Sequence, residues 1–181
     1  ELLHKTAKDI FSKLSMIEGR LADSRQLAEG PLRITVAEFI GATWLAPRIA
    51  QLRETHPDIQ LTLLLDDRVL NLNMREADVA IRLFKPDQPD LIQRQLTTIN
   101  FHVCAAKNYI KKHGKPASTK DLKYHTLIGY PETAAAPFAD PNWLFRTAGI
   151  DPEIHMNLVM VNSIQAICAA VQSGAGIAVL P

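Results

Sequence analysis

The pattern of hydrophobic and polar positions predicts a strand, a helix and a second strand early in the chain. Residues 32–36 are apolar and partly β-branched, as in a buried strand. Apolar side chains recur every three or four positions over residues 43–56, which indicates an amphipathic helix, and Pro57 ends it. Residues 59–65 alternate and predict the second strand. Because a helix joins the two strands, we expect them to be parallel, with a right-handed crossover.

The ends of these two strands are where the pattern predicts a ligand site. In open α/β sheets, ligands bind beyond the carboxyl ends of the strands, near the N-termini of the following helices. Ala37, Glu38 and Phe39 follow the first strand, and Asp66 and Asp67 follow the second. For each of these residues, helix capping or turn formation is an equally good explanation.

The first 29 residues carry a heptad pattern that predicts a long amphipathic helix. One core position of the heptad is occupied by Ala7, Leu14, Leu21 and Ala28, and the other by Leu3, Ile10, Ile17 and Ser24. A single helix has nothing of its own against which to bury this stripe, so we predict a dimerising linker helix. The alternative is a helix that packs on its own domain. Gly30 and Pro31 end the helix in either case.

Beyond residue 67, short strands and helices alternate, which predicts an α/β fold. Extended segments are expected at residues 79–82, 93–98, 101–106, 127–130, 153–161 and 176–180. Helices are expected at residues 69–72, 108–113 and 118–124, and from Ile164 to a stop at Gly174. Residues 85–90 and 131–141 are proline-containing and irregular, and we expect loops there.

Composition narrows the class of protein. A chain of 181 residues with 47% hydrophobic residues can bury one or two cores. The net charge of +1 lacks the basic excess of a domain that holds nucleic acid by itself. Two cysteines are too few for a disulfide framework, and the sequence has no secretory signal and no apolar run of roughly 20 residues. We therefore expect a cytoplasmic protein with no membrane contact.

The sequence shows no constellation typical of a catalytic or metal site. It contains no GxSxG, Walker A or HExxH motif, so we expect neither an enzyme nor a cofactor. Gly174 and Gly176 lie between a predicted helix and a predicted strand, which is the wrong order for a phosphate-binding loop. His102 and Cys104 are two residues apart, a spacing that fits a strand better than a metal site.

Two further features leave alternatives open. Cys104 is either a redox-sensitive thiol or, more simply, a buried thiol without a chemical role. Six lysines lie between Lys107 and Lys123. They form either a solvated face or an accessory contact with DNA phosphates.

Several segments, in one order, carry a resemblance to a known family. After the amphipathic helix come GPLRITVAEFIGATWLAPRIAQLRETHPDIQL, READVAIRLFKP, LTTINFHVCAAKNYIKKHGKPASTKDLKYHTLIGY and NSIQAICAAVQSGAGIAVLP. Together they resemble the linker helix and effector-binding domain of LysR-type transcriptional regulators. The resemblance implies an α/β fold of two Rossmann-like subdomains with periplasmic-binding-protein type II architecture. The implied bounds are 1–29 for the linker helix, 30–98 for subdomain I and 99–176 for subdomain II, with 177–181 returning to subdomain I.

The resemblance also implies a function. In this family a small-molecule effector binds in the cleft between the subdomains and alters DNA binding by a winged helix-turn-helix, through a homodimer or homotetramer. The winged helix-turn-helix would precede this chain, and further residues would follow Pro181 and complete subdomain I. The alternative is a stand-alone solute-binding protein of similar fold, against which the heptad pattern and the missing export signal argue.

Effector-binding positions follow from the same resemblance. In subdomain I they are Ala37, Glu38, Phe39, Asp67 and Arg82, all at predicted strand ends. In subdomain II they are Gly129, Tyr130, Asn162 and Ser163.

The charge of the first group bears on the effector. Many effectors of the family are small carboxylates, and Glu38 would repel a carboxylate unless a cation neutralised it. Arg82 is the candidate cation, although an arginine at a strand end can equally be solvated. We therefore expect a neutral, cationic or zwitterionic effector, or a small one bound through Arg82.

Overall fold

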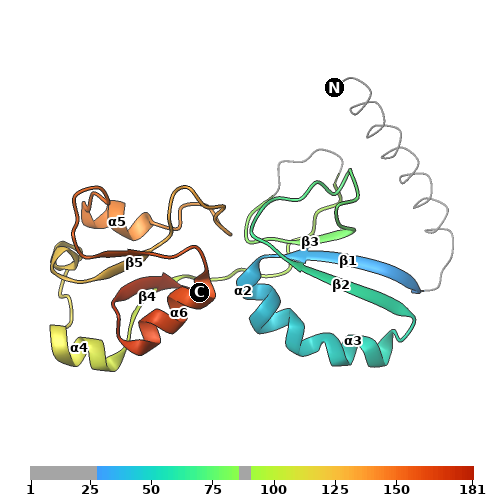
Figure 1. Cartoon of the computed structure of the whole chain (residues 1–181), viewed down its shortest axis with the longest axis horizontal. Coiled ribbons are helices and arrows are strands. Elements are labelled where there is room, and N and C mark those ends of the chain that lie inside the picture. The colour runs from blue at the N-terminus through green and yellow to red at the C-terminus, as the bar shows by residue number, and fades with distance from the viewer. Residues whose placement is uncertain (1–27, 86–90) are drawn as a thin grey trace, which may run out of the picture. The chain divides into compact units, whose positions relative to one another are not determined.

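A computed structural model describes residues 28–85 and 91–181 of the chain (Figure 1). The described residues form two compact units, which divide between Arg94 and Gln95. Residues 1–27 of the predicted linker helix lie outside the described residues, as do its proposed dimerisation positions Leu3, Ala7, Ile10, Leu14, Ile17 and Leu21. Within the described residues, no helix is both long and apolar enough to cross a membrane.

The first unit is built on a three-stranded parallel sheet of order β2-β1-β3. Strands β1 (Gly30–Val36) and β2 (Ile59–Leu65) pair along their whole length, and β3 (Val79–Ile81) pairs with the end of β1. The two predicted strands and their parallel pairing are confirmed. Because all three strands run the same way, their carboxyl ends meet at one edge of the sheet.

An irregular helical run joins β1 to β2 and lies along one side of these strands (Figure 1). It contains α2 (Glu38–Ile40), a π-helical turn (Gly41–Leu45), a 3-10 turn (Ala46–Arg48) and α3 (Ile49–Thr55). The run begins five residues before the predicted helix and ends, as predicted, before Pro57.

The irregularity of this run has a local cause. Pro47 has no backbone N–H and therefore cannot continue the regular α-helical hydrogen bonding. Two side chains add hydrogen bonds to carbonyls of the same run: the Thr43 hydroxyl donates to the carbonyl of Phe39 over 2.6 Å, and the Arg48 guanidinium donates to that of Trp44 over 2.7 Å. Gly41 lies so close to the sheet that a Cβ there would be 2.7 Å from Leu65.

Residues 66–78 connect β2 to β3 without a helix or strand. The predicted helix at residues 69–72 is absent, and the segment forms bends and turns. A side-chain contact stabilises them: the Glu76 carboxylate accepts the N–H of Asn71 over 2.6 Å. Local apolar spacing over four residues is too short a signal to distinguish a helix from such turns.

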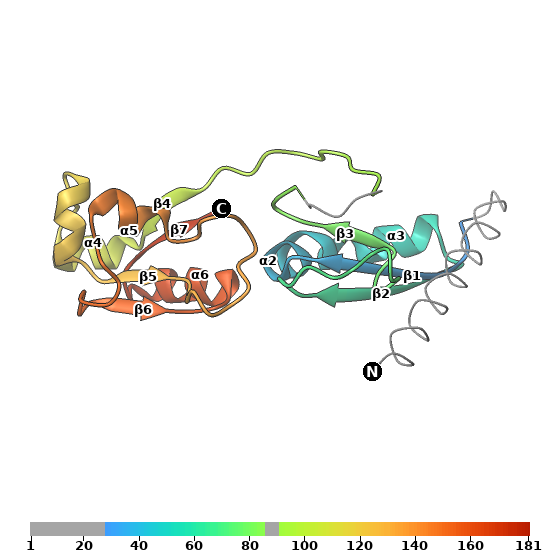
Figure 2. The same cartoon turned by 90° about the horizontal axis from the view of Figure 1, so that it is seen from above.

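The second unit contains a mixed sheet of order β4-β7-β5-β6 (Figure 2). Its strands are β4 (His102–Ala105), β5 (Leu127–Gly129), β6 (Leu158–Met160) and β7 (Ile177–Leu180). Strand β5 is parallel to both β6 and β7, and β4 is antiparallel to β7. The predicted strand at residues 153–161 is limited to β6, because residues 152–154 form a turn.

Strand β7 lies in a different unit from the one that the resemblance implies for its residues. We expect residues 177–181 to return to subdomain I, yet Ile177–Leu180 pairs with β4 and β5 and belongs to the second unit. Antiparallel pairing with β4 engages all four residues of β7, so the backbone groups of this strand are satisfied inside the second sheet.

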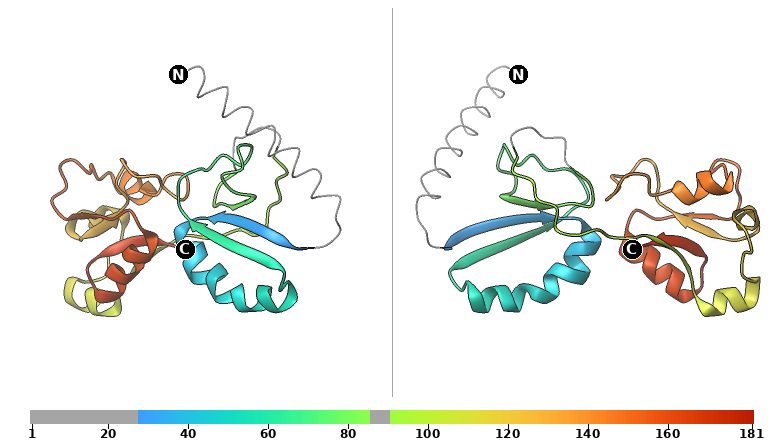
Figure 3. Two further views of the ribbon diagram at one scale, coloured as in Figure 1. Left: turned by 45° about the vertical axis from the view of Figure 1, so that its right-hand side comes forward. Right: turned by 180° about the vertical axis from the view of Figure 1, so that it is seen from behind.

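Helices cover both faces of the second sheet, with α5 (Trp143–Ala148) and α6 (Ile164–Ser173) on opposite sides of β5 (Figures 1 and 3). On the α5 side, Leu127 and Ile177 of the sheet join Phe145 in a buried core. On the α6 side, the helix presents Ile164, Ile167 and Val171, which are all buried. Helix α5 was absent from the predicted elements.

Two shorter helices complete this unit, and both were predicted. Helix α4 (Lys107–His113) ends at Gly114, whose φ of 81° lies in the left-handed region. A 3-10 helix (Thr119–Tyr124) begins with a capping box between Ser118 and Asp121.

The hydroxyl group of Tyr109 connects α4 to the strand region. Tyr109 is 3% exposed, and its oxygen accepts the N–H of Thr126 over 2.9 Å. The same hydroxyl lies 3.2 Å from Nδ1 of His125, which is also buried. One hydroxyl therefore provides a partner both for the Thr126 N–H and for the buried His125 ring.

We predict that Tyr109→Phe lowers the free energy of unfolding by about 1 to 2 kcal/mol, because two polar groups lose their partner. Urea unfolding followed by circular dichroism measures the change. Tyr124→Phe is the matched control, since Tyr124 is 73% exposed; its effect should stay within about 0.5 kcal/mol. Equal effects of the two substitutions would contradict the role given to the Tyr109 hydroxyl.

Candidate functional site

At the carboxyl edge of the first sheet, the structure brings together the residues predicted for subdomain I. Ala37, at 1% exposed, donates its N–H to the carbonyl of Ile81 over 3.3 Å, which ties the end of β1 to that of β3. Glu38 donates its N–H to Oδ1 of Asp67 over 3.0 Å, which ties the start of α2 to the end of β2. We call this edge the first rim, made of Ala37, Glu38, Phe39, Asp66, Asp67 and Arg82.

Asp67 therefore caps a helical segment 29 residues away in the sequence. Carboxylates are favoured at this place because backbone N–H groups of a helix N-terminus are unpaired and point outward. The acceptor role of Asp67 is therefore directed to Glu38 rather than to the turn of Asp67 itself, and its place in an effector site stays a prediction.

Arg82 is partly buried and makes hydrogen bonds within the first unit. Its guanidinium donates from Nη2 to the Thr35 hydroxyl over 2.7 Å and to the carbonyl of Arg68 over 2.9 Å. Thr35 is fully buried. Burial lowers the pKa of Arg82, while the neighbouring carboxylates of Asp66 and Asp67 raise it. Arg82 is thus hydrogen-bonded at the strand ends, and its role as the cation of an effector site stays a prediction.

Asp66 and Arg68 form an ion pair at the same edge. The two side chains meet at 2.6 Å, and Asp66 also accepts the backbone N–H of Arg68. The hydrogen bond from the Arg68 side chain lowers the pKa of Asp66, so this carboxylate stays charged well below neutral pH. Together with Glu38 and Asp67, the edge holds three carboxylates against two guanidinium groups.

In the second unit, the residues predicted for subdomain II also come together. The Tyr130 hydroxyl donates to the carbonyl of Asn162 over 2.6 Å, and the N–H of Val161 donates to the carbonyl of Gly129 over 2.9 Å. Ser163 caps α6 by accepting the N–H of Ala166 over 3.3 Å. Gly129, Tyr130, Asn162 and Ser163 form what we call the second rim.

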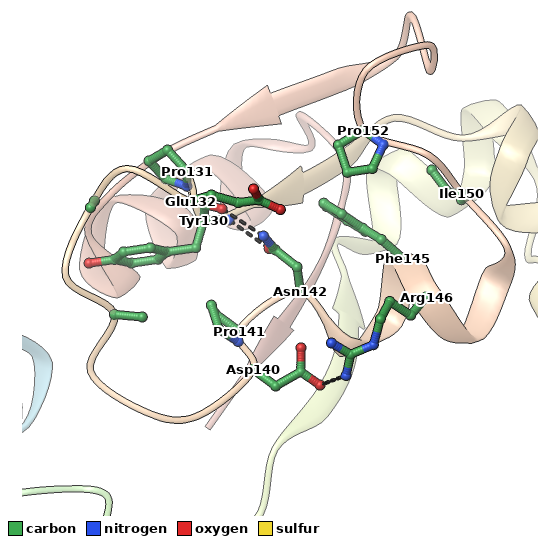
Figure 4. Close-up of a pocket in the computed structure, with 12 residues that line it drawn as sticks. Tyr130, Pro131, Glu132, Asp140, Pro141, Asn142, Phe145, Arg146, Ile150 and Pro152 are labelled. Atoms are coloured by element: carbon green, nitrogen blue, oxygen red, sulfur yellow. Dashed lines mark hydrogen bonds and ion pairs between the residues drawn. The ribbon is translucent and has the colours of Figure 1, made fainter.

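A cavity of about 320 Å³ lies beside the second rim, between the loop after β5 and helix α5 (Figure 4). Its apolar lining includes Phe145, Ile150 and the prolines at 131, 141 and 152. Its charged lining consists of Glu132, Asp140 and Arg146, of which Asp140 and Arg146 form an ion pair. The cavity can therefore take a small apolar group next to one carboxylate that has no ion-pair partner among the lining residues.

Asn142 lines this cavity and is hydrogen-bonded to Tyr130 of the second rim. Its side-chain amide accepts the N–H of Tyr130 over 2.9 Å and donates to the carbonyl of Tyr130 over 2.7 Å (Figure 4). Gly129 makes room for this arrangement, because a Cβ there would lie 2.4 Å from Phe145 and 2.8 Å from the Asn142 oxygen.

Of the residues that line the cavity, only Tyr130 was among the predicted site residues. One signal was present in the sequence: Trp143, Leu144 and Phe145 precede Gly149, which ends α5 in the left-handed conformation. The pairing of Asn142 with Tyr130 has no such signal, because it depends on where α5 packs.

The structure also bears on the candidate metal ligands and on the lysine cluster noted in the sequence. Among the described residues, no three histidine, cysteine or acidic side chains gather as a metal site would require. The six lysines between 107 and 123 are all exposed.

Comparison with known proteins identifies the family. The model of the LysR substrate binding domain matches residues 25–181, which is most of the chain. The chain belongs to the LysR substrate-binding domain family. The resemblance noted in the sequence is thereby confirmed, as is the α/β fold of periplasmic-binding-protein type.

Individual LysR relatives agree with this assignment. An HTH-type transcriptional regulator of Xanthomonas campestris is 27% identical over 175 residues, which is 96% of this chain and 51% of the relative. The regulator CrgA of Neisseria meningitidis is 30% identical over 128 residues, 71% of this chain and 43% of CrgA. The solved CrgA regulatory domain is 28% identical, with a TM-score of 0.65, and the match covers 84% of this chain and 72% of that domain.

This LysR chain spans about half the length of the curated relatives it matches. They are named as transcriptional regulators, which favours the effector-binding domain of a regulator over a stand-alone solute-binding protein.

We predict that Asp67→Ala lowers the free energy of unfolding by about 1 kcal/mol, because Glu38 loses its capping acceptor. Asp67→Asn keeps an acceptor oxygen without the charge and should cost clearly less. Thermal and urea unfolding of both variants measure the difference. If the asparagine variant lost as much stability as the alanine variant, the charge of Asp67 next to Arg82, and not the cap, would be the stabilising feature.

Proposed function

We propose that this chain is the sensing region of a LysR-type transcriptional regulator. A small-molecule effector binds at the strand ends of its subdomains and alters DNA binding by a winged helix-turn-helix elsewhere in the full-length protein. Residues 1–29 act as the linker and dimerisation helix of a cytoplasmic homodimer or homotetramer. The protein has no catalytic role of its own and needs no cofactor.

One observation carries this proposal: in each unit, predicted effector residues from distant parts of the sequence converge at the ends of parallel strands. The first rim joins Glu38 to Asp67, and the second rim joins Tyr130 to Asn162. Strand ends of this kind are where α/β sheets bind ligands. Two such groups, one in each unit, are what a ligand that couples two subdomains requires.

The first rim supports a neutral, cationic or zwitterionic effector. The anion-favouring N-terminus of α2 already has an internal carboxylate, since Asp67 accepts the N–H of Glu38. A carboxylate ligand at that place would have to displace Asp67 and approach the Glu38 side chain, both at an electrostatic cost.

Binding of a small anion through Arg82 has less support. The Arg82 guanidinium already donates hydrogen bonds to the Thr35 hydroxyl and the Arg68 carbonyl. An anion would therefore compete with contacts that hold the edge of the sheet together. On the second rim, Glu132 at the cavity adds a carboxylate and again favours a ligand with a positive group.

The proposal is tested by a thermal-shift screen of the full-length protein against amines and amino acids, with carboxylates of matched size. A ligand that binds only the folded state raises the unfolding temperature by mass action. We expect hits among amines and zwitterions. Asn162→Ala and Glu38→Ala should both reduce the shift in unfolding temperature. For Glu38→Ala, which removes a charged contact, we expect the affinity to fall by about tenfold or more.

Glu54→Ala is the matched control, because Glu54 is an exposed acid on α3, away from the strand ends. Unchanged affinity in Glu38→Ala would refute the charge preference. Hits confined to simple carboxylates would refute it as well. A ligand that binds without changing the affinity of the full-length protein for its DNA would favour the solute-binding alternative.

A further inference from the structure

Cys104 lies on the α6 side of the second sheet. In a strand, side chains alternate between faces, and Ala105 packs against the core on the α5 side, so its neighbour Cys104 points to the opposite face. The register agrees: Cys104 pairs with Ala178, whereas Ala105 pairs with Ile177 of the α5-side core.

Cys168 lies on the sheet-facing side of α6. The buried residues of this helix are Ile164, Ile167 and Val171, and Cys168 falls within the same stripe, one turn after Ile164. Helix α6 contacts β4, the strand that carries Cys104. Both thiols are free and partly buried, so the helix–sheet interface brings two cysteines from opposite elements together.

The electrostatics of the two groups agree with this placement. Burial raises the pKa of the Cys168 thiol, and the negative charge that Cys104 carries when ionised raises it further. Both causes agree with two thiols that share one helix–sheet interface. Because burial disfavours the thiolate of Cys168, we expect an oxidant to react first at Cys104.

We propose that Cys104 and Cys168 form an oxidisable dithiol, which closes to an intrachain disulfide between β4 and α6 when a peroxide reaches it. This site is distinct from the two rims, because neither cysteine belongs to them. Oxidation at this site would change the second unit without binding of the proposed effector.

The chemistry balances with hydrogen peroxide as the two-electron oxidant. The Cys104 thiolate attacks one peroxide oxygen, the O–O bond breaks, and hydroxide leaves, so that Cys104 becomes a sulfenic acid. Cys168 then loses its proton, its sulfur attacks the sulfur of Cys104, and the S–O bond breaks with release of water. The released hydroxide combines with the proton that Cys104 lost, so two thiols are oxidised to one disulfide and one peroxide is reduced to two water molecules.

The test treats the reduced protein with increasing hydrogen peroxide and follows free thiols and intact mass. We expect both thiols to disappear together, with the loss of two hydrogen atoms from the monomer. A non-reducing peptide map should join the peptide of Cys104 to that of Cys168. The closing step should become faster as pH rises, because the Cys168 thiolate becomes more populated.

Cys104→Ser and Cys168→Ser are the matched variants, each with one thiol left. Cys168→Ser should stop at the sulfenic acid of Cys104, which a dimedone-type reagent traps, and Cys104→Ser should react much more slowly. Three outcomes would overturn the proposal: thiols of the folded protein that resist peroxide, sulfenic acid at Cys104 in the wild type without closure, or disulfides only between separate chains.

Discussion

Parallel pairing of strands is the constraint on which both halves of this chain depend. When β1 lies between β2 and β3 with all three strands in one direction, segments that follow each strand arrive at the same edge. Parallel pairing of β5 with β6 has the same effect in the second unit and brings Tyr130 to Asn162. The position of each rim is therefore a result of strand direction before any side chain is considered.

The first rim shows how a helix N-terminus can be made unsuitable for an anionic ligand. Helix starts favour anions because their first N–H groups lack partners. Here Asp67 satisfies the N–H of Glu38, and Arg82 is directed to Thr35 and to a backbone carbonyl. The groups that would bind a carboxylate ligand thus already have partners within the unit, and this is the basis of the proposed preference for a positive or neutral ligand.

The second unit uses the two faces of its sheet for different purposes. On the α5 face, Gly129 allows Phe145 and Asn142 to approach the end of β5, and a cavity forms beside them. On the α6 face, small and aliphatic residues pack under the helix, and the two cysteines lie within that interface. Both faces belong to the same four-stranded sheet. A ligand bound at one face and a disulfide formed at the other would therefore both change the conformation of the second unit.

The sequence by itself determined the elements whose signals are local. Strands β1 and β2, helix α4 with its stop at Gly114, and helix α6 between Ser163 and Gly174 follow from periodicity and capping residues. The family, and with it the strand ends that carry the candidate residues, also followed from the sequence. Only the tertiary structure decided that Asp67 caps Glu38, that Arg82 reaches Thr35, that Asn142 holds Tyr130, and that β7 pairs inside the second sheet. These contacts join residues far apart in the chain, and their geometry depends on sheet register and helix packing, which no local pattern of side chains specifies.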